Sequence, residues 1–263
     1  MRRPRLPIIA LFTSLLAIAT ALSATPASAA GAQYVALGDS YSSGDGAGNY
    51  DPASGGCYRS YYAYPAQWAA NHPSSTFAFV ACAGATTTDV INNQLTALSS
   101  STNRVSITIG GNDVGFASVM QTCVLGSDTD CQNAVNHAKS IAQNQLPGWL
   151  SNLSTRIHAD APSAHVVVLD YPHLYYLTYV CVGLDYNKHV MLDNAADVLD
   201  GVIRNSAASA GFTFADVRNQ FSGHELCTGA GWLHSVTYPV GESYHPTQTG
   251  QTLGYLPVFT GAA

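Results

Sequence analysis

A serine, a glycine, an asparagine and a histidine stand at four well-separated points of the chain, in settings that suit acyl-transfer chemistry. Ser40 follows Gly38-Asp39, and a serine hydroxyl becomes nucleophilic when a neighbouring base takes its proton. His245, near the carboxyl end, is the candidate base. The backbone N–H groups of Ser40 and Gly84 and the side-chain amide of Asn112 would donate hydrogen bonds to the oxyanion of a tetrahedral intermediate. These residue types indicate a serine hydrolase.

Short, continuous apolar segments alternate with helical stretches along the chain. Such segments are typical of strands that are buried on both faces. The predicted strands are Tyr34–Leu37, Phe77–Ala81, Val105–Ile109, Val166–Leu169 and a weaker Phe212–Phe214. The predicted helices are Pro65–Asn71, Asp89–Leu98, Cys131–His158, which Pro147 should end or kink, and Lys188–Ala210. This alternation predicts an α/β fold in which helices cover both faces of a parallel sheet.

Three of the candidate residues follow predicted strands directly. Ser40, Gly84 and Asn112 lie in polar, glycine-rich turns after the first, second and third strands. Parallel sheets place their active sites at the carboxyl ends of the strands. The three turns should therefore meet at one edge of the sheet, where His245 would join them.

Four sequence blocks resemble those of the SGNH, or GDSL-type, hydrolases, and they occur in that family's order. The blocks are Gly38-Asp39-Ser40-Tyr41-Ser42, Cys82-Ala83-Gly84-Ala85, Gly110-Gly111-Asn112-Asp113 and Ser243-Tyr244-His245-Pro246. The resemblance spans residues 34–246. It implies a three-layer α/β/α fold with a central parallel sheet, of the flavodoxin-like kind, and hydrolysis of carboxylic esters. It also implies Ser40 as nucleophile, His245 as base, and Ser40, Gly84 and Asn112 as the oxyanion hole.

The residue that orients His245 is open at this stage. The family commonly has an aspartate three residues before the histidine, where this chain has Glu242. Some secreted members use a main-chain carbonyl two residues before it, here that of Ser243. We expect the Ser243 carbonyl to orient the imidazole, giving a Ser–His dyad, with Glu242 as the alternative third member of a triad.

Each candidate also has a purely structural alternative. Ser40 and Asn112 could cap helices, Gly84 could only turn the chain, and His245 could be a loop residue. The presence of all four blocks favours the catalytic interpretation. Asp39 and Asp113 are expected to hold their turns through hydrogen bonds to nearby backbone groups.

The first thirty residues have the pattern of a secretory signal peptide: three arginines, an apolar stretch and an Ala-x-Ala site. The alternative is a membrane anchor, but the apolar stretch is shorter than the roughly 20 residues that a span needs. Removal of residues 1–30 leaves residues 31–263 as a single secreted domain, with seven basic and sixteen acidic residues and a formal net charge of −9. This charge argues against nucleic-acid binding, and we expect a monomer without a membrane span.

Six cysteines remain after the leader, an even number that suggests three disulfides in an exported protein. Fifteen pairings are possible, and we expect the sequential one: Cys57–Cys82, Cys123–Cys131 and Cys181–Cys227. A metal site is the alternative. His224-Glu225 begins like a zincin helix, but Thr228 stands where the second histidine would be. No metal or cofactor is therefore expected.

Tyrosines gather in two segments, after Cys57 and after the fourth predicted strand. The first group is Tyr58, Tyr61, Tyr62 and Tyr64, and the second is Tyr171, Tyr175, Tyr176 and Tyr179. Aromatic loops at the mouth of a site suit acyl chains, although half of these tyrosines could serve packing alone. We expect a lipase or esterase acting on small-molecule or lipid esters through an acyl-enzyme, with at most transient contact with a lipid interface. A phospholipase A, a polysaccharide or feruloyl-type esterase, and an inactive surface- or carbohydrate-binding protein are the alternatives.

Overall fold

The computed structural model describes Met1 and residues 32–263, so the leader predicted for residues 1–30 lies outside the residues it describes. Five parallel strands form one sheet in the order β2-β1-β3-β4-β5. The strands are β1 (Tyr34–Gly38), β2 (Phe77–Phe79), β3 (Arg104–Thr108), β4 (His165–Leu169) and β5 (Thr213–Ala215). This arrangement confirms the predicted parallel sheet.

Each strand was predicted to within two residues at either end. Strand β2 ends at Phe79, two residues before the predicted end, because the N–H groups of Val80 and Ala81 both donate to the carbonyl of Ala36 and break the regular ladder. Strand β5 lies one residue later than predicted. Strands β1, β3 and β4 are almost wholly buried, as their continuous apolar sequences indicated.

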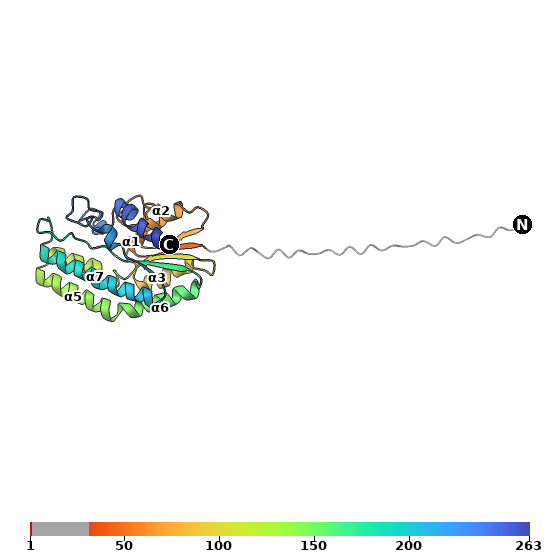
Figure 1. Ribbon diagram of the computed structural model, residues 1–263, viewed down its shortest axis with the longest axis horizontal. Coiled ribbons are helices and arrows are strands. Elements are labelled where there is room, and N and C mark those ends of the chain that lie inside the picture. The colour runs from red at the N-terminus through yellow and green to blue at the C-terminus, as the bar shows by residue number, and fades with distance from the viewer. Residues whose placement is uncertain (2–31) are drawn as a thin grey trace. The chain divides into compact units, whose positions relative to one another are not determined.

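Helices cover both faces of the sheet (Figure 1). One face packs against α2 (Tyr64–Ala70), α8 (Arg218–Phe221), the π-helical segment Gly250–Tyr255 and α9 (Leu256–Ala262). The other packs against α3 (Thr87–Asn93), α6 (Leu146–Asp160) and α7 (Tyr186–Ser209). Helix α5 (Asp128–Asn144) lies against α7 and α6, and α4 (Phe116–Leu125) lies against α5. Short helical pieces occur at α1 (Ser40–Ser43), Pro52–Cys57, Leu95–Ala97 and Val240–Glu242. The result is the expected three-layer α/β/α fold.

The predicted helix Cys131–His158 is two helices, α5 and α6, which meet at Gln145. Pro147 stands in the first turn of α6, where its missing N–H needs no partner. Helix α5 begins three residues earlier than predicted, because Ser127 and Asp130 form a reciprocal capping box. The predicted single helix is therefore divided near the proline into two helices that follow each other directly in the same layer.

Three disulfides cross-link the chain, and the structure pairs the cysteines in the sequential order that we expected. They are Cys57–Cys82, Cys123–Cys131 and Cys181–Cys227. Among the described residues, one group of possible metal ligands comes together, namely Cys181, His189 and Cys227. Its two sulfurs are bonded to each other, so neither is a thiolate. No helix in residues 32–263 has both the length and the apolar character needed to cross a membrane.

Candidate active site

The turn that carries Ser40 is held by hydrogen bonds and by close packing. Gly38 ends β1 with φ +119°, and a side chain there would collide with the carbonyl oxygen of Thr108. Asp39 caps α1, and its Oδ1 accepts from the N–H of Tyr41 at 3.0 Å and from the hydroxyl of Thr108 at 2.6 Å. Ser40 is thus the first residue of a helix whose starting point is fixed by β1 and β3.

Tyr171, from the loop after β4, supports this turn from the other side. Its hydroxyl donates to Oδ2 of Asp39 and accepts from the backbone N–H of Gly111 at 3.2 Å. Burial raises the pKa of Asp39 to about 6, although the hydrogen bonds from Thr108 and Tyr171 oppose that rise. Asp39 therefore links the Ser40 turn to β3 and to the loop after β4.

His245 lies between Ser40 and the carbonyl of Ser243. Its Nε2 is 2.7 Å from Oγ of Ser40, and its Nδ1 is 3.1 Å from the Ser243 oxygen. These two contacts fit the neutral imidazole with its proton on Nδ1, leaving Nε2 to accept from the serine hydroxyl. Burial lowers the pKa of His245 to about 4, while the hydrogen bond to Ser243 partly offsets that effect. The imidazole is therefore neutral, and able to act as a base, above about pH 4.

Glu242 faces a different partner. Its Oε1 accepts a hydrogen bond of 2.7 Å from the hydroxyl of Tyr50, which itself accepts from the N–H of Gly46 at 2.9 Å. Asp45 lies nearby, and burial, together with repulsion from the Glu242 charge, raises the pKa of Asp45 to about 7. The glutamate thus ties the histidine loop to the segment after α1. This arrangement favours the Ser243 carbonyl as the group that orients His245.

The three expected oxyanion donors come from three strand ends. The N–H of Ser40 stands at the start of α1, where a helix has no internal partner for it. Asn112 lines the same pocket as Ser40, and one of its two amide N–H groups donates to the carbonyl of Ala85 at 3.0 Å, leaving the other for a ligand. Gly84, next to Ala85, is exposed with φ +79°, and a Cβ built there meets open space. The Asn112–Ala85 bond thus joins the Gly84 turn to the Asn112 turn.

The second and third turns are also fixed to each other by Asp113. Its carboxylate accepts from the hydroxyl of Thr87 at 2.6 Å and from the Thr87 backbone N–H at 3.1 Å. Asp39 and Asp113 both hold backbone groups in place, as expected. The Gly84 and Asn112 turns are therefore cross-linked by hydrogen bonds.

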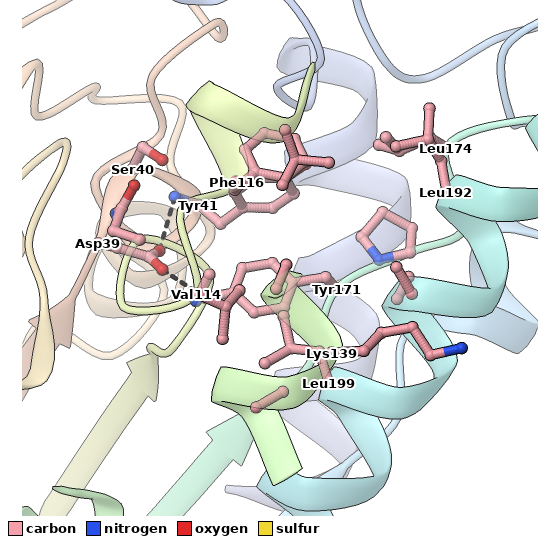
Figure 2. A pocket seen from close by; sticks show the side chains of 18 residues that line it. Asp39, Ser40, Tyr41, Val114, Phe116, Lys139, Tyr171, Leu174, Leu192 and Leu199 are labelled. Carbon is pink, nitrogen blue, oxygen red and sulfur yellow. Dashed lines mark hydrogen bonds between the residues drawn. The ribbon is translucent and has the colours of Figure 1, made fainter. Parts of the chain in front are cut away.

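A narrow apolar pocket of about 80 Å³ opens beside Ser40 and runs between α4, α5 and α7 (Figure 2). Asp39 and Ser40 lie at one end, while Leu174, Leu192 and Leu199 lie farther along, as Figure 2 shows. The walls are almost entirely aliphatic or aromatic side chains. They include Tyr41, Val114, Phe116, Val119, Ala138, Ala142, Tyr171, Pro172, Leu174, Leu192, Ala195, Ala196 and Leu199. This pocket has the chemistry to accept a hydrocarbon chain attached to a carbonyl at Ser40.

The two tyrosine groups divide between packing and exposure. Tyr64, Tyr171 and Tyr175 are buried, whereas Tyr61 and Tyr179 are largely exposed. Nothing in the sequence distinguished Tyr171 from the other tyrosines of its group, and Tyr50 was not among the candidate residues. The position of Tyr171 directly after a buried strand was the one sequence feature that could have indicated a place in the site.

The site has the arrangement found in serine hydrolases. A hydroxyl is hydrogen-bonded to an imidazole, the imidazole is hydrogen-bonded to a carbonyl, and backbone and amide N–H donors lie beside them. The model of the GDSL-like Lipase/Acylhydrolase family matches residues 36–253. The chain belongs to this family and is a serine ester hydrolase. The resemblance found in the four sequence blocks is thereby confirmed.

Several similar relatives are proteins from Streptomyces. The chain is 52% identical to Lipase 1 of Streptomyces coelicolor over 257 residues, which cover 97% of this chain and 95% of that protein. The crystal structure of an extracellular lipase from Streptomyces rimosus is 52% identical, with a TM-score of 0.86, and covers 88% of this chain and 99% of its own. The crystal structure of phospholipase A1 from Streptomyces albidoflavus is 51% identical, with a TM-score of 0.86, and the match covers 89% of this chain and 100% of that one.

Proposed function

We propose that the protein hydrolyses acyl esters of lipids, including phospholipids, through a Ser40–His245 dyad and an acyl-enzyme. The observation that carries the proposal is the 2.7 Å contact between Ser40 Oγ and His245 Nε2 at the mouth of an apolar pocket. The names of the similar Streptomyces lipases and phospholipase A1 support the same substrate class. A polysaccharide esterase is less well supported, because few polar groups line the pocket.

In the first step, His245 takes the proton of Ser40 as Oγ attacks the ester carbonyl. The N–H groups of Ser40 and Gly84 and the Asn112 amide donate to the resulting oxyanion. His245 then protonates the leaving alcohol, and the acyl group remains on Ser40. A water molecule, deprotonated by His245, attacks the acyl-enzyme and releases the acid. The neutral Ser243 carbonyl holds the imidazole but stabilises its cation less than a carboxylate would, so the oxyanion donors carry a larger share of the catalysis.

We also propose that residues 31–263 form the single catalytic domain, exported after removal of residues 1–30 and acting as a monomer. The extracellular source of the Streptomyces rimosus lipase supports export. Three disulfides among the described residues suit the same compartment.

Replacing Ser40 by alanine tests the nucleophile. Ser40→Ala should abolish hydrolysis of nitrophenyl esters and covalent labelling by a fluorophosphonate, while the circular dichroism spectrum is unchanged. Ser43→Ala is the matched control in the same short helix and should keep both labelling and activity. Labelling that persists in Ser40→Ala would place the nucleophile elsewhere.

The substrate class is tested by a panel of nitrophenyl butyrate, nitrophenyl palmitate, phosphatidylcholine and acetylated xylan. Long acyl esters and phosphatidylcholine should be hydrolysed, because the pocket beside Ser40 accepts a hydrocarbon chain. Ala195→Phe, at a half-buried wall position, should lower the palmitate-to-butyrate ratio of kcat/KM at least tenfold, the order that one or two methylene groups contribute in an apolar pocket. Faster deacetylation of xylan than hydrolysis of any long acyl ester would contradict the proposal.

A further inference from the structure

Large apolar side chains are exposed on two loops that lie side by side. We call these side chains the loop patch. They are Leu177, Tyr179, Val180 and Val182 on the first loop and Val236, Tyr238 and Val240 on the second. Tyr179, Val182 and Tyr238 are 84%, 99% and 95% exposed. The loops flank one groove of about 610 Å³, which Val180, Val182 and Val236 line together. A contiguous group of this kind marks an interaction surface rather than scattered surface residues.

Covalent and hydrogen-bonded anchors hold the loop patch in its outward position. The disulfide Cys181–Cys227 fixes the first loop. At its base, the N–H of Tyr176 donates to the carbonyl of Leu226 at 2.8 Å. The second loop is closed by a hydrogen bond of 3.0 Å from the N–H of Thr237 to the hydroxyl of Ser243. Both loops therefore present apolar side chains to solvent on a fixed frame.

The loop patch is electrically neutral, although the chain as a whole is acidic. Residues 176–184 and 226–241 contain no lysine, arginine, aspartate or glutamate, whereas the whole chain carries a formal net charge of −6. A cationic surface would be needed to attract anionic lipid. A neutral surface with exposed tyrosines instead suits the boundary between headgroups and acyl chains of zwitterionic lipid, where aromatic side chains are enriched.

Two chain segments connect the groove of the loop patch to the acyl pocket and to the dyad. Leu174 lines the pocket, and the next residue, Tyr175, lines the groove between the loops. Tyr244 also lines the groove, and its backbone carbonyl accepts a hydrogen bond of 2.7 Å from the hydroxyl of Tyr41, beside Ser40. His245 follows Tyr244 directly. A lipid layer resting on the loops would thus lie next to the pocket mouth.

We propose that the loop patch is the docking surface by which this enzyme rests on aggregated zwitterionic lipid, an inference that builds on the proposed lipid-ester hydrolysis. Docking buries the exposed side chains in the headgroup boundary. It lets an acyl ester pass from the layer into the pocket without full exposure to water. The surface contributes binding to the aggregate and takes no part in the chemistry at Ser40.

Vesicle flotation of the Ser40→Ala protein, which does not consume the lipid, tests the proposal with phosphatidylcholine vesicles. In that background, Val182→Ser with Tyr238→Ser should lower the partition coefficient at least tenfold, because both side chains lose apolar area that docking buries. The matched control, Trp149→Ser with Leu253→Ser, removes one aromatic and one aliphatic exposed side chain elsewhere and should change it less than twofold. With Ser40 intact, both double variants should hydrolyse soluble nitrophenyl butyrate within twofold of wild type.

Three results would overturn the assignment. The two double variants could partition equally, the parent protein could fail to float with the vesicles, or it could bind only to vesicles that contain phosphatidylglycerol. A dimer, detected by sedimentation without lipid, that dissociates only in the loop-patch variant would also overturn it, because the surface would then serve a second copy. Flotation of Ser40→Ala, without lipid hydrolysis by the intact enzyme, would refute the proposed function and leave the docking surface in place.

Discussion

Glu242→Gln separates a Ser–His dyad from a triad in this enzyme. The substitution keeps the size and shape of the side chain and removes its charge, while the Tyr50 hydroxyl can still donate to the amide oxygen. In the structure, Glu242 bonds to Tyr50 at 2.7 Å and the Ser243 carbonyl lies 3.1 Å from Nδ1 of His245. The dyad predicts that Glu242→Gln retains most of its turnover.

The expected magnitude follows from the Tyr50 hydrogen bond. A hydrogen bond to a charged acceptor contributes about 1.5–3 kcal/mol and one to a neutral acceptor about 0.5–1.5 kcal/mol, so the change weakens this contact by about 1 kcal/mol. Even if all of that were lost from the transition state, kcat would fall by no more than about tenfold. Neutralising the acid of a true triad lowers kcat by about 10⁴. The two mechanisms therefore differ by about a thousandfold.

The assay is kcat on nitrophenyl butyrate, with thermal denaturation to verify the fold. Tyr50→Phe removes this hydrogen bond altogether while Glu242 keeps its charge, and its effect on kcat should also be mild. Ser243→Ala, which keeps the carbonyl, should be mild as well. Since the Glu242 charge helps to raise the pKa of Asp45 to about 7, that pKa should fall in the Glu242→Gln protein when followed by carboxyl NMR. A loss of a thousandfold or more in Glu242→Gln, with the fold intact and Tyr50→Phe mild, would refute the dyad.

Three further measurements test the electrostatics, the support of the nucleophile and the cross-links. Because burial lowers the pKa of His245 to about 4, kcat/KM should be lost as the pH falls through about 4, and an acid limb near 6.5 would contradict this. Tyr171→Phe keeps the pocket wall but removes a hydrogen-bond donor to the charged Asp39, so kcat should fall about tenfold while KM for a short ester stays within twofold. The pKa of Asp39 should rise above 6 in this variant. An unchanged kcat would mean that Tyr171 does not position the Ser40 turn. The intact mass of the protein should show no free thiol. Replacing both Cys57 and Cys82 by serine should lower the free energy of unfolding, measured by urea denaturation, by about 3 kcal/mol. Unchanged stability would mean that this disulfide hardly constrains the unfolded chain.

The sheet and the turns were predictable because their signals are local. A strand buried on both faces requires a continuous apolar run, and the polar turn after it is read from adjacent residues. β1, β3 and β4 were found almost at their observed positions for this reason. β2 was misjudged at its end because Val80 and Ala81 are apolar, although their N–H groups share one acceptor, Ala36.

The supporting contacts of the site were not predictable, because each joins residues that are distant in the sequence and of ordinary type. Tyr171 and Asp39 are 132 residues apart, and Tyr50 and Glu242 are 192 apart. No spacing rule relates such pairs. The apolar pocket likewise depends on how α4, α5 and α7 pack, which an amphipathic pattern does not specify. The preference for the Ser243 carbonyl could be stated from the family resemblance, but the position of Glu242 required the fold.

The 205 residues that separate Ser40 from His245 also determine when the enzyme can begin to act. Ser40 is synthesised early, and His245 follows it 205 residues later. A partly synthesised chain carries Ser40 without the imidazole that contacts its hydroxyl. Ester hydrolysis can therefore start only after the segment that carries His245 has folded back against the turn that carries Ser40.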